Sequence, residues 1–448
     1  MNLLILLLIS VPALFSASYF FARFKALSVV SALLTLLLAA ALNILSTDSH
    51  GFFLLDTMSR ILILTVSIVY LMSTLFALGY HHHLGESRNM RLHLSMMHLF
   101  VASMLFSLTV NNYGFLWIGI ELTTVSSALL LVIEENRLNV EAAWRYVIIV
   151  SSGLAISLIS IVMIYRAFGT LDIYNLISSV HSVSLITEIA AATALIGFGT
   201  KIGLVPMHTW LPDAHSEAPS EISSMFSGVL LPVAVYALYR IYEITYSSRV
   251  EGLYLFFAFI TIAVAALLMP SQRYYKRMFA YSTMENMALI VIGLVIGGIG
   301  LTGAIVLLVS HAFAKAGAFY SSGNILSATG KRNIGDVKGL LVTMPQSSFY
   351  MLFSSLAVTG APPFGTFVGI FLIFMGLAHA GLFVMIALTA PLILITFSSV
   401  NMKVGSMLFS PSPGDTMHEA GRLQRAVAVS SITLSAAVSI IFFLAGGL

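Results

Sequence analysis

Ionisable side chains lie inside strongly apolar stretches of this chain. Glu121 lies in WIGIELTTVSSALLLV, Lys201 ends AATALIGFGTK, and His311 and Lys315 lie four residues apart in SHAFAKAGAFY. A charge at mid-membrane costs roughly 2.5–3.5 kcal/mol on insertion scales, so such groups are rare unless they pair or line an ion pathway. Acids and bases in such surroundings can pass protons through bound water. A series of them along one bundle indicates an ion path.

Two further ionisable residues have a plainer alternative interpretation. Arg145 lies near the start of the sixth apolar run, and Glu285 lies in the tenth. Near the end of a span, a charged side chain can snorkel to the interface or pair with a neighbouring helix. We include Arg145 in the predicted ion path and Glu285 as an accessory polar residue.

The composition indicates a chain embedded in a lipid bilayer. The 21 Lys and Arg and 18 Asp and Glu residues make up 9% of 448 residues, against roughly 25% in soluble proteins. Hydrophobic residues make up 59%, and the mean hydropathy is +0.99. These values exclude a soluble domain, a disordered chain and a nucleic-acid binder. Because the chain has no cysteine, it cannot hold a cysteine-ligated zinc ion or an iron–sulfur cluster.

Apolar runs long enough to cross the hydrocarbon core recur along the whole sequence. A membrane helix needs about 20 such residues, and we predict an all-α polytopic membrane protein with about 14 spans. The predicted spans cover approximately 2–22, 27–46, 60–79, 94–111, 114–133, 142–165, 187–211, 220–243, 252–270, 278–299, 302–328, 345–378, 381–402 and 424–446.

A faint internal match suggests that the bundle contains two halves. EAAWR at 141–145 and HAFAK at 311–315 each have a polar residue followed four positions later by a cation. The spacing predicts two inverted five-helix repeats, made of spans four to eight and nine to thirteen. The predicted segments are an N-terminal three-helix segment at 1–93, the first repeat at 94–243, the second repeat at 252–402, and a C-terminal loop with the last helix at 403–448.

Loop charges predict the orientation in the membrane. Lys and Arg residues predominate in the odd-numbered loops, whereas the even-numbered loops hold Arg60, Arg166, Arg240 and Arg249. Cytoplasmic loops are enriched in Lys and Arg. We therefore expect both termini to face the extracytoplasmic side of the plasma membrane of a prokaryote.

Prolines interrupt two of the predicted spans. Pro206 follows Lys201 in the seventh span, and Pro362 and Pro363 lie in TGAPPFGTF in the twelfth. Proline removes a backbone donor, and freed backbone groups at membrane depth are tolerated only inside protein or beside water. Paired broken helices in two halves point to an ion site in an inverted-repeat transporter. A simple proline kink is the alternative.

The segment 201–240 reads KIGLVPMHTWLPDAHSEAPSEISSMFSGVLLPVAVYALYR. With QRYYKRMFAYSTMEN at 272–286 and SHAFAKAGAFYSSGNI at 310–325, it resembles the antiporter-like membrane subunits of complex I, NADH:quinone oxidoreductase. The same family includes Mrp-type sodium/proton antiporter subunits and subunits of formate hydrogenlyase, hydrogenase-4 and other energy-converting membrane-bound hydrogenases. EAAWRY and YSTMENM are most similar to the hydrogenase-type branch. The resemblance implies fourteen helices, with helices seven and twelve broken.

The resemblance also implies roles for individual residues. Glu121 matches the glutamate of helix five and Lys201 the lysine of helix seven, which are expected to form a charge pair whose separation drives a proton onward. Lys315 and His311 match the central polar residues of helix eleven. The remaining matches are Arg145, where many relatives have lysine on helix six, and His208, Asp213 and His215 at the helix-seven break.

Two departures from the family pattern affect the expected path. Pro232 stands where many relatives have a lysine on helix eight, and proline cannot titrate. Ile370 stands where relatives carry a glutamate or lysine on helix twelve. No Asp, Glu, Lys or Arg occurs between Lys338 and Lys403, and His379 is the one titratable replacement. The exit charge is therefore missing.

Three functions remain open at this point. The first is a proton- or sodium-translocating subunit of a multi-subunit redox complex, in which Lys315 and His311 relay the ion. The second is a structural or conformational-relay subunit with a closed ion path, and the third is an Mrp-type cation/proton antiporter subunit. This chain itself would be non-catalytic. Iron–sulfur, nickel–iron or flavin centres would lie in partner subunits, which would include antiporter-like paralogues and a peripheral redox arm.

A histidine run is the remaining metal-like motif. His81, His82 and His83 lie in a predicted cytoplasmic loop beside Glu86 and Arg88. Histidine clusters can bind metals. We favour a solvated loop and predict no metal site.

Overall fold

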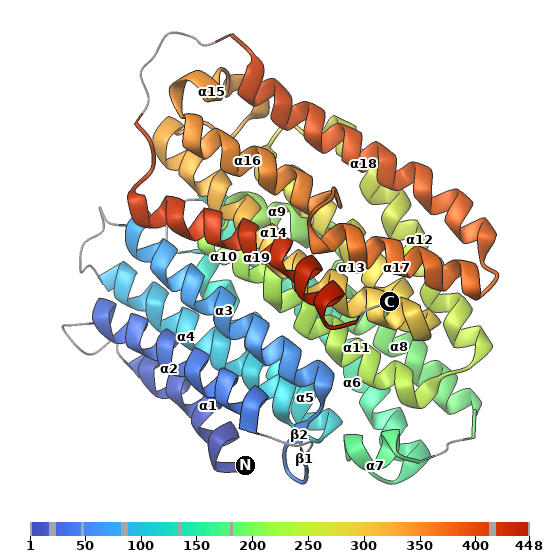
Figure 1. Ribbon diagram of the computed structural model, residues 1–448. Coiled ribbons are helices and arrows are strands. Elements are labelled where there is room, and N and C mark those ends of the chain that lie inside the picture. Colours follow the sequence, from blue (N-terminus) through green and yellow to red (C-terminus); the bar gives the residue numbers. More distant parts are fainter. Residues whose placement is uncertain are drawn as a thin grey trace.

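The chain folds as a bundle of α-helices. The computed structural model describes residues 2–17, 24–45, 49–81, 88–132, 137–179, 182–411 and 418–446. Within these ranges, the only strands are β1 (Ser49–His50) and β2 (Leu54–Leu55), which pair antiparallel at one end of the bundle (Figure 1). The predicted all-α class is confirmed.

Long helices lie side by side through the molecule, with α1 to α4 at one edge and α18 at the opposite edge (Figure 1). The N-terminal helices are α1 (Asn2–Phe15), α2 (Phe24–Leu45), α3 (Thr57–Tyr80), α4 (Arg88–Thr109), α5 (Tyr113–Leu131), α6 (Arg137–Phe168), α7 (Ile173–Ile177), α8 (Leu185–Ile202), α9 (Trp210–Glu217), α10 (Ser220–Met225) and α11 (Leu231–Thr245). The C-terminal helices are α12 (Ser248–Leu268), α13 (Tyr275–Ile296), α14 (Gly298–Thr329), α15 (Leu340–Thr343), α16 (Pro345–Val358), α17 (Gly365–His379), α18 (Phe383–Phe409) and α19 (Arg422–Leu444). Among the described residues, 12 candidate spans are long and apolar enough to cross a membrane. The predicted total of fourteen spans stays a prediction.

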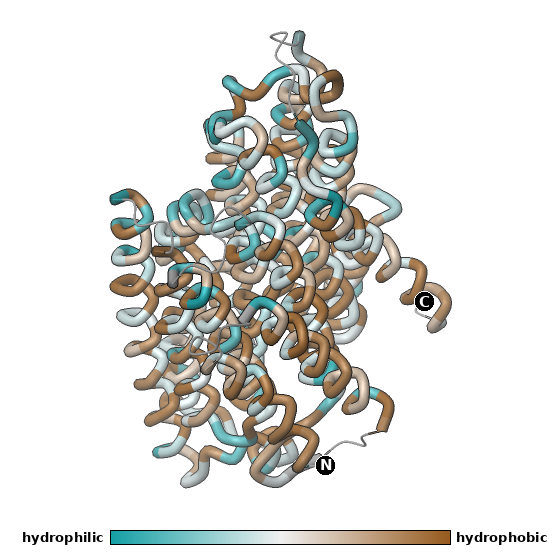
Figure 2. The backbone as a smooth tube through the Cα atoms, turned by 90° about the vertical axis from the view of Figure 1, so that its left-hand side faces the viewer, coloured by the Kyte–Doolittle hydropathy of each residue, from teal (hydrophilic) through white to brown (hydrophobic). Residues whose placement is uncertain are grey.

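The peripheral helices present apolar side chains outward. On α18, Val384, Leu388 and Leu394 are 74%, 49% and 64% exposed. Figure 2 shows hydrophobic stretches along the helices and several hydrophilic stretches at helix ends. By contrast, α11, α13 and the middle of α14 are buried on nearly all sides. The bundle therefore has a lipid-compatible surface and a protein-enclosed centre that can hold polar groups.

Both proline interruptions predicted from the sequence are present. Helix α8 ends at Gly203, whose φ of +86° closes the helix in the left-handed region that glycine tolerates. The chain then passes through a cis Val205–Pro206 bond before α9. Between α16 and α17, Gly360 has a φ of +75° and the Pro362–Pro363 bond is cis. Each break thus combines a left-handed glycine with a cis proline.

Two helix pairs that include a segment of a broken span pack closely. Helix α6 packs on α8, and α14 packs on α17. A Cβ added to Gly197 would lie 2.5 Å from the Ser157 nitrogen, and one added to Gly369 would lie 2.6 Å from the Leu307 nitrogen. Glycines at these interfaces let the backbones approach, as is common in membrane proteins. The two inverted five-helix repeats stay a prediction.

A π-helical turn interrupts one of the two most buried spans. Between α10 and α11, the segment η4 (Phe226–Leu230) forms a π-helical turn, in which a backbone N–H bonds to the carbonyl oxygen five residues earlier. Pro232 lies directly after this turn at the start of α11, where its missing backbone donor is accommodated. Gly228 faces α14, and an added Cβ would lie 2.8 Å from the Ala312 carbonyl oxygen. Pro232 therefore lies beside an irregular stretch of backbone.

Candidate functional site

Lys201 lies in the last turn of α8, directly before the first break, and is completely buried. Its Nζ donates to Thr124 Oγ1 at 2.8 Å and to the Tyr146 hydroxyl at 2.7 Å. The Tyr146 hydroxyl also hydrogen-bonds with Ser127 Oγ at 2.7 Å. Helices α5 and α6 thus hold the lysine amine among neutral oxygens.

Glu121 lies one turn before Thr124 on α5, close enough for its charge to act on Lys201 and Tyr146. Its Oε1 accepts a hydrogen bond from Ser151 Oγ at 2.7 Å. No ion pair joins Glu121 directly to Lys201. The direct charge pair implied by the family resemblance is therefore not formed in this structure, because the Lys201 amine donates its hydrogen bonds to two hydroxyl groups instead.

A phenylalanine ring lies next to residues of two polar groups. The Phe226 ring centroid lies 5.7 Å from the ring of Tyr146 and 6.0 Å from the ring of His215. Phe226 is completely buried and begins the π-helical turn η4. Phe226 therefore borders both Tyr146, which accepts from Lys201, and His215.

The second polar group lies among α9, α13 and α14. His215 is buried and stacks on the Phe319 ring at 4.9 Å, and neither of its ring nitrogens has a hydrogen-bond partner among the described residues. Lys315 Nζ donates to the Phe279 carbonyl oxygen at 2.8 Å and to Ser282 Oγ.

The titratable side chains of this second group lie near enough for their charges to act on one another. His311 interacts with His215 and with Lys315, and Lys315 interacts with Glu285. Glu285 is buried in the middle of α13 and not at its end, and it faces Thr396 of α18. The structure thus brings together four of the ionisable residues that the sequence singled out.

The position of the missing charge on helix twelve is apolar. Ile370 on α17 is half-buried and packs against the hydrophobic core, and a Cβ on Gly360 would lie 2.7 Å from its Cδ1. Its neighbour Gly369 touches the backbone of Leu307. Glu285 is an acid whose charge acts on Lys315.

Arg145 has a different position from the one predicted. Its side chain is 56% exposed and forms ion pairs with Glu141 at 2.6 Å and Asp213 at 3.1 Å. The interpretation of Arg145 as a buried charge is wrong, because α6 begins at residue 137 and places Arg145 in its exposed early turns. Its part in ion movement stays a prediction.

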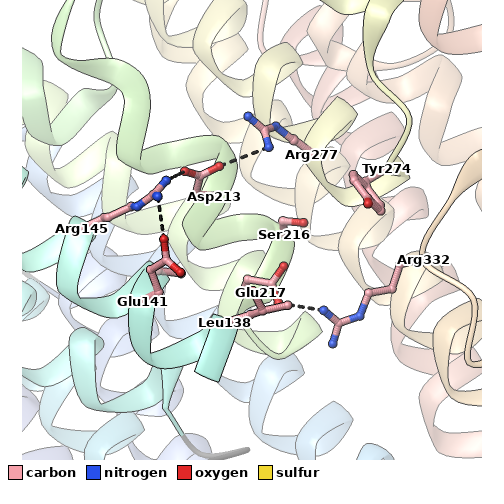
Figure 3. Close-up of a pocket in the computed structure, with 10 residues that line it drawn as sticks. Leu138, Glu141, Arg145, Asp213, Ser216, Glu217, Tyr274, Arg277 and Arg332 are labelled. Atoms are coloured by element: carbon pink, nitrogen blue, oxygen red, sulfur yellow. Dashed lines mark hydrogen bonds and ion pairs between the residues drawn. The ribbon is translucent and has the colours of Figure 1, made fainter. Parts of the chain in front are cut away.

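Glu141, Arg145 and Asp213 line a cavity of about 340 Å³ (Figure 3). Arg277 pairs with Asp213 at 3.3 Å, and Arg332 pairs with Glu217 at 2.7 Å. Three arginines and three acids thus surround one hollow (Figure 3). His208 lies in the short turn η3 (Met207–Thr209), half-buried. The cavity is lined mainly by charged side chains.

Several polar residues of the site were missed in the sequence. Tyr146 and Thr124 hold the lysine amine, yet neither is ionised, so only their helical spacing from Arg145 and Glu121 could have indicated them. Arg240 was assigned to a loop, which is wrong. Its side chain is 4% exposed within α11 and pairs with Asp56 and, at 2.8 Å, with Glu243.

One known family matches most of the chain. The family described as NADH:quinone oxidoreductase/Mrp antiporter, transmembrane, matches residues 110–396. The chain belongs to this family and is an antiporter-like, multi-pass membrane subunit, which confirms the resemblance. It is 32% identical over 343 residues to the Hydrogenase-4 component F homolog of Methylacidiphilum infernorum (isolate V4), with 72% of each chain covered. It is 27% identical over 336 residues to Hydrogenase-4 component B of Escherichia coli (strain K12), covering 70% of this chain and about half, 49%, of that protein.

The fold is also shared with a chain of known structure. A chain of the membrane-bound sulfane sulfur reductase, an archaeal respiratory membrane complex, superposes with a TM-score of 0.87 at 22% identity over 97% of both chains. At that identity, the likeness shows the fold.

Proposed function

We propose that this chain moves protons or sodium ions across the membrane as part of a multi-subunit redox complex. The observation that carries the proposal is the environment of two lysines. Lys201 and Lys315 are completely buried, and each amine is held by neutral oxygen atoms and not by a carboxylate. A buried lysine that only served structure would be expected to have a paired acid. Neutral partners leave the amine able to gain and lose a proton.

The proposed path has two segments. An ion approaches through the cavity beside Asp213 and reaches the group around Lys201, whose charge responds to Glu121. It then passes the Phe226 ring to His215 and His311. Buried polar atoms without protein partners, such as the His215 ring nitrogens, are where proteins bind internal water. The ring of Phe226 supplies an apolar constriction, which can gate conduction by excluding water.

The exit in this proposal avoids helix twelve. Lys315 would pass its ion toward Glu285 and the polar side chains of α18, because the space at Ile370 is filled by apolar contacts. Asn401 of α18 continues this polar region, donating to Thr359 Oγ1 at 3.0 Å and accepting from Ser355 Oγ at 2.9 Å.

A structural role with a closed path is the second candidate. It is favoured by the apolar packing at Ile370 and by Pro232, which removes the titratable residue of helix eight. An Mrp-type antiporter subunit is the third candidate, and the charged cavity serves that role as well as the first.

The assembly and placement follow from the same proposal. Partners would be further antiporter-like membrane subunits and a peripheral arm that holds the redox centres, since this chain has no cysteine. We propose the plasma membrane of a prokaryote, with both termini on the extracytoplasmic side.

The test is Lys201→Met in the assembled complex, reconstituted in vesicles. Ion pumping should fall while the complex still assembles, because methionine fills the same space without a titratable amine. Lys331→Met, on a loop outside the described spans, is the matched control and should pump normally. Normal pumping and turnover in Lys201→Met would favour the structural candidate.

A further inference from the structure

Two histidines and a glutamate converge in the interior, away from the ion path described above. His81 lies at the end of α3, His93 on α4 and Glu221 in the first turn of α10. All three side chains are 0% exposed. The predicted solvated loop is therefore wrong for His81, whereas His82 and His83 lie outside the described residues.

The three side chains meet at one point. The Nε2 atom of His81 lies 2.7 Å from Glu221 Oε1, and the Nε2 atom of His93 lies 3.0 Å from the same oxygen. One ligand atom from each residue lies within 4.8 Å of the other two. The second carboxylate oxygen, Oε2, has no hydrogen-bond partner among the described residues.

We propose that His81, His93 and Glu221 form a binding site for a divalent transition-metal ion of the Zn²⁺ class. Two imidazoles and one carboxylate with a fourth position for water are an established zinc donor set. Zinc binds nitrogen and oxygen at about 2.0–2.2 Å, which sets neighbouring ligand atoms in a tetrahedron roughly 3.3 Å apart. The observed separations of 2.7 and 3.0 Å need to open by only a few tenths of an ångström.

The charge balance favours a cation at this point. Glu221 is buried, and among the described residues it pairs with His81 and His93 and with no lysine or arginine. The hydroxyl of Tyr320 also lies near enough to feel its charge. A buried carboxylate is costly unless it is paired or bound to metal. A divalent ion would neutralise it while the two imidazoles stay neutral, the form in which histidine binds metal.

The location gives the site a structural consequence. Its ligands come from the consecutive helices α3 and α4 and from α10, which lies far along the chain after the break that follows Lys201. A bound ion would fix α3 and α4 of the N-terminal segment to the start of the span that carries Phe226. The inference is independent of ion translocation, since it would hold equally for a structural subunit.

The test uses the full chain purified in its complex, stripped with a chelator and titrated with Zn²⁺ or Co²⁺ alone. The wild type should bind one ion tightly, and Co²⁺ should give the visible absorption of a tetrahedral site. His93→Gln and Glu221→Gln should each weaken binding by at least about tenfold, because loss of a direct ligand costs no less than loss of an outer partner. His98→Gln is the matched control, buried on the same helix but bonded to Ser28.

The result separates a metal site from a hydrogen-bonded cluster. Wild-type protein that binds no ion, or that binds equally well after either substitution, would overturn the inference. In that case the three side chains share protons without a metal. Zn²⁺ should also raise the unfolding temperature of the wild type and the His98→Gln control, and not that of the two ligand variants.

Discussion

Replacing Phe226 with alanine should connect the two polar groups of the ion path. The ring is completely buried, and its centroid lies 5.7 Å from Tyr146, 6.0 Å from His215 and 5.8 Å from Phe100. Its removal leaves space on the order of 100 Å³, room for about three water molecules at about 30 Å³ each. The Tyr146 hydroxyl and the His215 ring nitrogens would give that water the polar partners it needs.

We expect the substitution to uncouple ion movement from electron transfer, while electron transfer itself continues. In reconstituted vesicles, Phe226→Ala should raise the passive ion leak and lower the ratio of ions moved per electron. Truncation of a buried phenylalanine costs about 3–5 kcal/mol of folding free energy, so assembly must be checked by size and subunit composition. Phe226→Leu keeps the position apolar at a cost below about 1.5 kcal/mol and should retain tight coupling.

A neighbouring ring provides the matched control. Phe100→Ala creates a similar cavity beside the same residue but away from the ionisable groups, so it should destabilise the protein without raising the leak. An assembled Phe226→Ala complex with normal coupling and no added leak would refute the gating role of this ring.

Three further substitutions test other parts of the account. Glu285→Gln should lower ion pumping while leaving assembly intact, because it removes the proposed acceptor beyond Lys315; unchanged pumping would place the exit elsewhere. Gly203→Ala should lower stability by about 1–2 kcal/mol, measured by thermal unfolding, because the residue is left-handed and its Cβ would lie 2.7 Å from a methyl group of Leu211; no loss would show that the break can relax. Burial raises the pKa of Asp56, but Arg240 and hydrogen bonds outweigh it and hold that pKa below its ordinary 3.8. The carboxylate therefore stabilises the fold at neutral pH and loses this effect as pH falls below about 3.8, and Asp56→Asn should remove that acid-dependent part of thermal stability.

The sequence was informative where one residue type forces a local outcome. Proline removes a backbone donor, and Pro206 and the pair Pro362–Pro363 predicted both breaks. Pro12 and Pro391 nevertheless lie inside helices α1 and α18. Long apolar runs predicted the membrane-spanning helices because the bilayer fixes their length. These features depend on local chemistry, and the structure confirms them.

The side-chain contacts between helices were harder to predict from the sequence. Glu121 and Lys201 were expected to meet directly, but Thr124 and Tyr146 supply hydroxyl groups at that point. Hydroxyl residues in a membrane helix usually bond to their own backbone, so their type alone does not reveal such a role. Similarly, Glu221 is a single acid after a proline, and only folding brings it to His81 across the bundle.

The ratio of ions moved per electron in vesicles that contain the assembled complex with Lys315→Met tests the central claim most directly. Lys315 belongs to the half in which helix twelve lacks its charge, so it distinguishes a working path from a closed one. The account predicts a lower ratio with near-normal assembly. A ratio equal to that of the wild type would show that buried lysines in this chain do not carry ions.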